Sequence, residues 1–156
     1  MKIDLEINNT TNSPIKDGFF TIVAEKTFAE LKYSLLKDKE VEISVALVTP
    51  EEIKKLNKEY RKNDSVTDIL SFPEYKNIKE IEEAAAEKDS KKLFLGELIL
   101  CYNDIKEYAD RERLDLAGEL AGVMSHGILH LLGFLHGEKM FAIQNKIQEE
   151  TRCKKQ

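Results

Sequence analysis

The stretch Leu114–Gly137 reads LDLAGELAGVMSHGILHLLGFLHG and decides how the rest of the chain is arranged. Between Leu116 and Phe134 the only charged side chain, histidines aside, is Glu119. A helix that is apolar on nearly all sides is buried, so this segment is predicted to run through the centre of the protein. Four of the seven glycines lie on it or at its end, at positions 118, 122, 127 and 133. Glycine costs a helix up to about 1 kcal/mol relative to alanine, so these glycines predict close approach by a neighbouring element.

The rest of the chain shows apolar residues at the spacings that are typical of strands and of helices. Apolar side chains recur at every second residue in 3–7 and 41–47, as in half-buried strands. Strands are predicted at 3–7, 41–47, 66–73 and 93–101, and helices at 15–36, 50–62 and 102–111. The polar segment 74–92 is predicted to be a mobile excursion around a short helix. The expected fold is a single α+β domain spanning residues 1–156, in which a small mixed sheet of about four strands packs with helices around the central helix.

Length and composition restrict the class of protein. The chain has 156 residues and a mass of 17.9 kDa, the size of one domain that buries roughly two-thirds of its unfolded surface. No apolar run approaches the ~20 residues of a membrane-spanning helix, and the start MKIDLEINN lacks the apolar stretch of a signal peptide. A cytoplasmic protein with Cys101 and Cys153 as reduced thiols is therefore expected. The net charge of −5 means that any polyanionic partner must be bound by one face.

All three histidines of the chain lie within eleven residues, at His126, His130 and His136. Residues i and i+4 of an α-helix share a face about 6 Å apart, so the first two imidazoles can bind one ion. Gly133 is suited to the left-handed residue that ends a helix, and a turn there would bring His136 round as a third ligand. The alternative, three separate core histidines, would bury imidazoles without a cation. Three nitrogen ligands leave one tetrahedral position of a zinc ion open, which is typical of a catalytic site.

The same spacing, H-x-x-x-H-x-x-G-x-x-H, is the ligand pattern of the metzincin peptidases. In those enzymes a glutamate after the first histidine is the general base, whereas Gly127 stands at that position here. Because glycine cannot accept a proton, the pattern predicts a zinc site without the peptidase base. A closed structural zinc site is a further alternative, which would require Cys101 or Cys153 to fold back as the fourth ligand.

Three motifs together resemble the YbeY family, the bacterial endoribonucleases or rRNA maturation factors. Residues 126–136, HGILHLLGFLH, resemble the family pattern H-G-x-L-H-L-x-G-[YF]-D-H. Residues 57–73, NKEYRKNDSVTDILSFP, resemble its signature N-x-x-Y-R-x-x-x-x-x-T-D-[VI]-L-S-F-P, and residues 95–100, LGELIL, are similar to its L-G-[DE]-I-x-I strand. Leu135 departs from the pattern, because the family usually has at that position an aspartate that could orient an imidazole.

The resemblance implies a zinc-dependent endoribonuclease that cuts single-stranded RNA in 16S rRNA 3′-end maturation and ribosome quality control. It implies that His126, His130 and His136 bind one Zn²⁺ per chain and that Arg61 is the functionally required arginine. The implied partners are single-stranded RNA and small-subunit ribosomal RNA, with ribosomal proteins or an assembly GTPase, whereas DNA and membranes are not expected. A metal-stabilised ribosome assembly factor that does not cleave RNA and a zinc metallopeptidase are the alternatives.

Charged side chains in the same motifs are further candidates. The guanidinium of Arg61 suits bidentate contact with a phosphate, the alternative being a solvated residue at a helix end. The nearby lysines form either a track for the RNA backbone or a solvated helix face: Lys54, Lys55, Lys58 and Lys62. Asp68 and Glu97 are possible proton carriers, or else cap, strand-end or salt-bridge residues. The expected site is a cleft edged by the strand that ends at 71–73, with either water or the RNA 2′-hydroxyl as nucleophile.

Overall fold

The computed structural model of the chain describes residues 1–31 and 34–152 and confirms the predicted α+β fold. In chain order the elements are β1 (Lys2–Asn9), α1 (Asp17–Leu31), a 3₁₀ turn η1 (Ser34–Leu36), β2 (Glu40–Leu47), α2 (Pro50–Arg61), β3 (Ile69–Pro73), α3 (Ile78–Ala85), β4 (Lys92–Leu100), α4 (Tyr102–Glu112), α5 (Leu116–Leu131) and α6 (Glu138–Thr151). Among these described helices, none has the length and apolar character needed to cross a membrane.

The four strands form one mixed sheet in the order β1-β2-β4-β3. Strands β1, β2 and β4 are parallel, and β3 is antiparallel to β4 at one edge. The Cys101 amide donates a hydrogen bond to the Asp68 carbonyl (2.9 Å), so the backbone at position 68 faces β4. In an antiparallel pair, the backbone N–H and C=O groups of successive residues point alternately toward the partner strand and away from it. Those of Ser71 therefore point away from β4, toward the open edge of the sheet.

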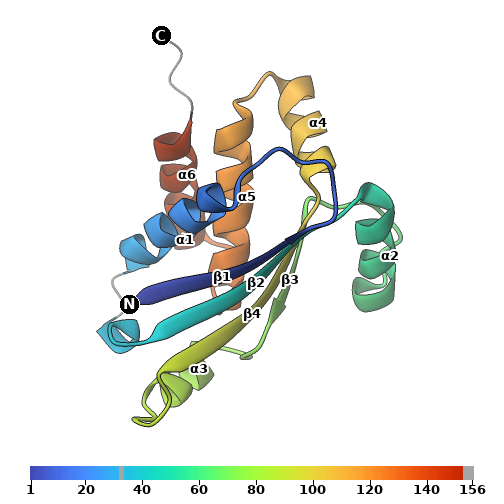
Figure 1. Cartoon of the computed structure of the whole chain (residues 1–156). Coiled ribbons are helices and arrows are strands. Elements are labelled where there is room, and N and C mark those ends of the chain that lie inside the picture. The colour runs from blue at the N-terminus through green and yellow to red at the C-terminus, as the bar shows by residue number, and fades with distance from the viewer. Residues whose placement is uncertain (32–33, 153–156) are drawn as a thin grey trace.

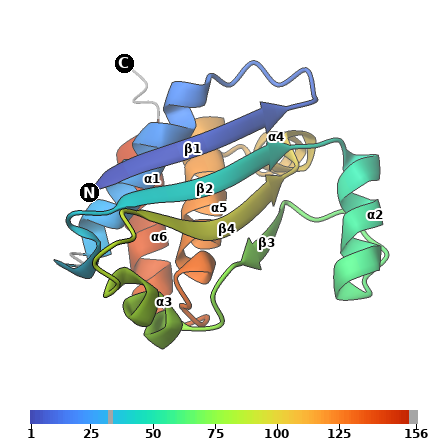
Figure 2. The same ribbon diagram turned by 60° about the horizontal axis from the view of Figure 1, so that its bottom comes forward.

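Helices α1, α5 and α6 lie side by side on one face of the sheet, and α2 stands apart near the start of β3 (Figures 1 and 2). The main core is formed where inward-facing strand side chains such as Val45 and Leu98 meet α5, whose Met124 and Ile128 are fully buried. A smaller core on the other face of the sheet includes Ile53 of α2. The two cores fix α2 and α5 on opposite sides of β3.

The central position predicted for the glycine-rich helix is confirmed. A side chain at Gly122 would approach the Gln148 side chain to 2.9 Å, because α6 packs closely there. A side chain at Gly127 would lie 2.5 Å from the tip of Ile69 on β3 and 2.9 Å from that of Leu98 on β4. The glycines of α5 therefore allow a helix on one side and a strand on the other to reach its backbone.

Four features differ from the sequence prediction. The helix expected at 15–36 is shorter, with α1 at 17–31 and the 3₁₀ turn at 34–36, while 32 and 33 lie outside the described residues. The strand expected at 66–73 begins only at Ile69. Segment 74–92 does contain the predicted short helix, but Ile81 and Ala85 of α3 are buried in the main core, so this helix is part of the packed domain. Helix α6 was not predicted, although its buried Met140, Ile143 and Ile147 recur at the spacing of an amphipathic helix.

Replacing Gly96 by alanine is expected to destabilise the fold by about 2–4 kcal/mol. Gly96 lies on β4 with a φ of +138°, a conformation that favours glycine, and a Cβ there would overlap the carbonyl oxygen of Phe72 on β3. The measurement is urea unfolding of the variant against the parent. Gly18→Ala is the matched control, since a side chain at Gly18 meets nothing within 4 Å and should leave stability unchanged or slightly raised. Equal stability of the Gly96→Ala variant and the parent would contradict this account of β4.

Candidate metal centre

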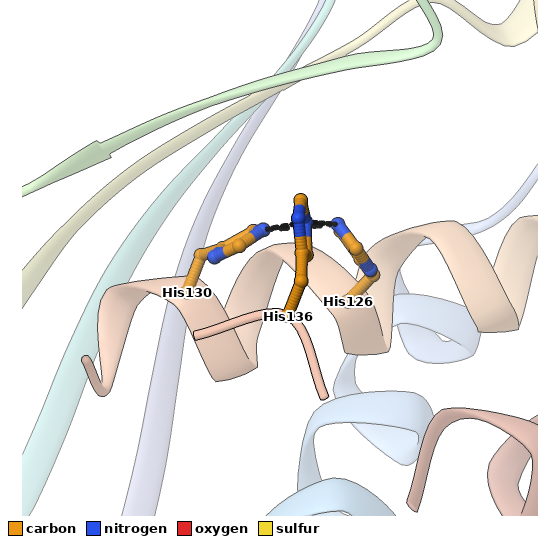
Figure 3. A group of neighbouring side chains, drawn as sticks. All are labelled: His126, His130 and His136. Carbon is orange, nitrogen blue, oxygen red and sulfur yellow. Dashed lines mark hydrogen bonds between the residues drawn. The ribbon is translucent and has the colours of Figure 1, made fainter. Parts of the chain in front are cut away.

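The three histidines converge on one point, as the sequence predicts (Figure 3). His126 and His130 lie one turn apart on α5, and His136 comes from the loop that follows this helix. The Nε2 atom of His130 lies 3.0 Å from that of His126 and 3.0 Å from that of His136, and the remaining pair is 3.4 Å apart. In the described part of the chain, this is the one group of histidine, cysteine or carboxylate side chains placed to hold a metal ion.

The end of α5 determines where the third histidine lies. Gly133 adopts a φ of +85°, its amide donates to the His130 carbonyl (3.0 Å), and the Phe134 amide donates to the Leu129 carbonyl (3.0 Å). This pair of bonds is a Schellman motif, which ends a helix and reverses the chain direction. The left-handed residue predicted at Gly133 is confirmed, and the reversal brings His136 back to the two helical histidines.

The arrangement of the three Nε2 atoms suits binding of a divalent metal ion better than hydrogen bonding between the rings. Two nitrogens bound to one tetrahedral zinc ion at 2.0–2.1 Å are about 3.3 Å apart, close to the separations of the Nε2 atoms. The Nδ1 atom of His130 lies 3.2 Å from the Phe134 carbonyl oxygen, which can only accept, so this nitrogen carries the ring proton. The Nε2 atom of His130 is then unprotonated, and its lone pair faces the Nε2 atoms of His126 and His136. A metal ion placed between the three rings can accept a lone pair from each Nε2 atom.

Burial lowers the pKa of the His130 imidazole, and the neighbouring His126 and His136 lower it further. The folded, metal-free protein therefore takes up a proton at His130 only at lower pH than the unfolded chain does. Its stability should fall as the pH drops through the ordinary histidine value near 6.5, because the unfolded chain is protonated first. Thermal unfolding of metal-free protein at pH 7.5 and 5.5 measures this loss. A His130→Gln variant should lose less stability over that interval, and an equal loss in both proteins would contradict the assignment.

The histidines form one wall of a cleft of about 720 Å³. The opposite wall is edge strand β3 with the residues that lead into it, and the guanidinium of Arg61 borders the same space. The expectation that the strand ending at 71–73 edges the cleft therefore agrees with the structure. Lys76, which sequence reasoning did not single out, adds a second cationic side chain to the lining.

Arg61 is held in place by the edge strand. Its Nη2 donates to the outward-facing carbonyl of Ser71 (2.6 Å), and its guanidinium carbon lies 5.2 Å from the centre of the Phe72 ring. The bond to Ser71 uses one of the five N–H groups of the guanidinium. The remaining N–H groups are available to an anion in the cleft.

The lysines proposed as a backbone track do not line the cleft. Lys54, Lys55, Lys58 and Lys62 are all exposed on α2 or directly after it. Lys58 lies 3.9 Å from Asp64, and the Lys62 ammonium donates to the Glu59 carbonyl (3.4 Å). Their role in RNA binding stays a prediction.

The two candidate carboxylates lie in different places. Asp68 borders the cleft and also an adjacent hollow that contains Asp104 and Glu119. Glu97 lies between Gly96 and Leu98 on β4, and Leu98 faces α5. Because side chains alternate along a strand, Glu97 points to the opposite face of the sheet, away from the histidines. The structure thus brings Asp68, and not Glu97, to the histidine cleft.

Neither the peptidase-type zinc site nor the closed structural zinc site has the additional residue that it needs among the described residues. The tips of Ile69 and Leu98 occupy the space into which a side chain at position 127 would point, so β3 and β4 pack against α5 at the residue that corresponds in sequence to the peptidase glutamate. Cys101 is a buried free thiol in the smaller core and is not part of the histidine group. Cys153 lies outside the described residues.

Sequence reasoning missed two side chains that contact the histidines, both on α6. The amide oxygen of Gln144 lies 2.9 Å from Nδ1 of His126, and the Phe141 ring stacks on His136 with ring centres 6.0 Å apart. Leu135 is 86% exposed, so the residue in the place of the family's aspartate points into solvent. The only sequence signal for Gln144 is the pair Gly118 and Gly122 on α5. Two glycines on one helix face predict that another helix packs closely there, but they do not give the register of that helix.

Comparisons with known proteins agree on one family. The profile of the family described as Endoribonuclease YbeY matches residues 6–152. Relatives named Endoribonuclease YbeY include one from a Sulfurihydrogenibium species, 34% identical over 145 residues that cover 89% of this chain and 86% of the relative. Another, from Bacillus velezensis, is 32% identical over 156 residues that cover 96% of each chain. The solution structure of a Thermotoga maritima protein is similar, with a TM-score of 0.58, 29% identity and coverage of 95% of this chain and 89% of that one.

Proposed function

The chain belongs to the Endoribonuclease YbeY family, and on that basis we propose that it is a zinc-dependent endoribonuclease that cuts single-stranded RNA. Its proposed task is 3′-end maturation of 16S rRNA and ribosome quality control in the cytoplasm. Its proposed partners are small-subunit ribosomal RNA and, through the family resemblance, ribosomal proteins or an assembly GTPase.

One observation carries the catalytic part of this proposal. Three Nε2 atoms lie within 3.4 Å of one another in a cleft that is also lined by Arg61, whose guanidinium is hydrogen-bonded to Ser71. A metal position beside a fixed cation suits a reaction in which negative charge builds on a phosphate group. The Gly127 contacts described above leave no carboxylate at the base position of a peptidase, which favours the phosphodiester over the peptide bond as substrate.

Each side chain has a role that follows from its position. His126, His130 and His136 would hold the zinc ion, which would supply Lewis-acid chemistry toward a phosphate oxygen or a water molecule. Arg61, anchored on Ser71, uses its remaining N–H groups to orient the phosphate and to stabilise charge that develops on it. Asp68 is the proposed proton carrier because it borders the cleft.

The proposal is tested with purified protein, a labelled single-stranded RNA and a denatured protein substrate, each incubated with and without a metal chelator. Metal analysis should return about one zinc ion per chain. RNA cleavage that the chelator stops and added zinc restores supports the proposal. Intact RNA despite bound zinc would favour the non-cleaving assembly factor, and a cleaved protein substrate would favour the peptidase. A substrate with one 2′-deoxy nucleotide at the cleaved position shows whether the 2′-hydroxyl or water is the nucleophile.

A further inference from the structure

Two of the three histidines, His126 and His130, differ in the group that binds the ring nitrogen facing away from the metal position. The Nδ1 atom of His130 is held by the backbone carbonyl of Phe134, and that of His126 is held by the side chain of Gln144. Gln144 is half-buried on α6, one turn before Gln148, and it lines the cleft. It reaches His126 because α6 packs closely against the glycines of α5.

An imidazole that binds a metal through Nε2 must carry its proton on Nδ1. The hydrogen-bond partner of Nδ1 determines how strongly this tautomer is preferred. A backbone carbonyl only accepts, so it admits a single tautomer at His130. An amide side chain accepts through its oxygen but donates through its nitrogen if it turns over. With its oxygen 2.9 Å from Nδ1, Gln144 accepts the hydrogen bond of the Nδ1-protonated ring and favours the tautomer of His126 that leaves Nε2 free for the metal.

We infer that Gln144 is the positioning residue of the metal centre, which sets the tautomer and orientation of His126. Leu135 points into solvent and cannot take this part. In the described structure Gln144 is the one side chain that hydrogen-bonds to an Nδ1 atom of the histidine group. Loss of such a hydrogen bond typically lowers metal affinity by 10- to 100-fold.

A purely structural role for Gln144, filling the contact between α5 and α6, makes different predictions. Gln144→Leu keeps the size and the packing but removes the acceptor, and Gln144→Glu keeps an acceptor that cannot donate when ionised. Gln148→Leu is the matched control, because Gln148 lies one turn further along α6 and contacts Glu119 and Gly122 in place of the histidines.

The experiment measures zinc affinity of the whole chain by competition with a chromophoric chelator at neutral pH. We expect Gln144→Leu to bind zinc about tenfold or more weakly, Gln144→Glu to bind it at least as tightly as the parent, and Gln148→Leu to be unchanged. In the metal-free protein, ¹⁵N spectra of the imidazole should show Nδ1-protonated His126 in the parent and in Gln144→Glu, and a mixture of tautomers in Gln144→Leu.

Either of two results would overturn the inference. The first is parental zinc affinity in Gln144→Leu, and the second is failure of Gln144→Glu to restore the affinity that Gln144→Leu loses. The inference shares the zinc centre with the proposed function, but affinity and tautomer are measured without RNA. A protein that binds zinc as expected but leaves RNA intact would refute the nuclease proposal and leave the role of Gln144 standing.

Discussion

Replacing His126 by alanine is expected to reduce bound zinc from about one ion per chain to background and to abolish RNA cleavage. Two nitrogen ligands remain, and the pair formed by His130 and His136 lacks the clamp that two residues on one helical face provide. Metal analysis after dialysis measures the loss of zinc, and a labelled single-stranded RNA measures the loss of cleavage. Circular dichroism checks that α5 still forms.

His136→Ala gives the same test without disturbing the helix. His136 is exposed and lies in the loop after α5, so its removal leaves the packed core intact. Loss of zinc in both variants is the expected result. A His136→Ala protein that keeps its zinc and its cleavage rate would show that the ion is held by other groups, and the three-histidine centre would have to be abandoned.

Replacing Arg61 by alanine is expected to slow RNA cleavage on the order of 10²- to 10³-fold while the zinc content stays at the parental level. The guanidinium lies in the cleft but is not a metal ligand, so its removal affects the phosphate and not the ion. Arg61→Lys should recover only part of the rate, since an ammonium cannot make both the bond to Ser71 and a bidentate contact with a phosphate. Single-turnover cleavage rates of the three proteins, with metal analysis of each, provide the measurement.

Lys106→Ala is the control for charge alone. Lys106 is a cation on α4 that pairs with Asp110 and takes no part in the cleft. Its removal lowers the net charge by the same amount and should leave the cleavage rate unchanged. Equal slowing in Lys106→Ala and Arg61→Ala would mean that the rate follows overall charge, and the specific role of Arg61 would be wrong.

The metal centre could be predicted from sequence because its geometry is local. His126 and His130 are separated by one helical turn, and Gly133 supplies the turn that returns the chain. Eleven residues, 126–136, therefore contain nearly all the information that brings the three imidazoles together. The alternation of apolar residues in β1 and β2 is local in the same way, and β1, β2 and β4 were predicted within two residues of their observed ends.

The partners of the site are not local, and sequence reasoning could not find them. Gln144 reaches His126 only because α6 docks against α5 in one register, and Arg61 finds the Ser71 carbonyl only because β3 is an edge strand. Periodicity assigns a side chain to a face of its own helix, but it does not say which atom of another element lies opposite. For the same reason Asp68 and Glu97 looked equivalent in sequence, although only Asp68 reaches the cleft.

The late start of α1 has a local cause that propensity alone does not reveal. The Asn9 side chain donates to the Ser13 carbonyl (3.2 Å), and the Ile15 amide donates to the Ser13 hydroxyl (3.3 Å). Hydrogen bonds of this kind offer the backbone an alternative to a helix. The helix consequently begins at Asp17, and apolar Ile15 packs against the main core from the preceding loop.

The position of β3 at the border of the sheet has a consequence for the kind of polymer that can be processed. No further strand in the described chain pairs with its outer side, so the cleft between β3 and the imidazoles is not covered by another strand there. An RNA strand can approach from that side without threading a free terminus through a tunnel. Scission at internal linkages, with both flanks protruding into solvent, is the outcome that such lateral entry permits.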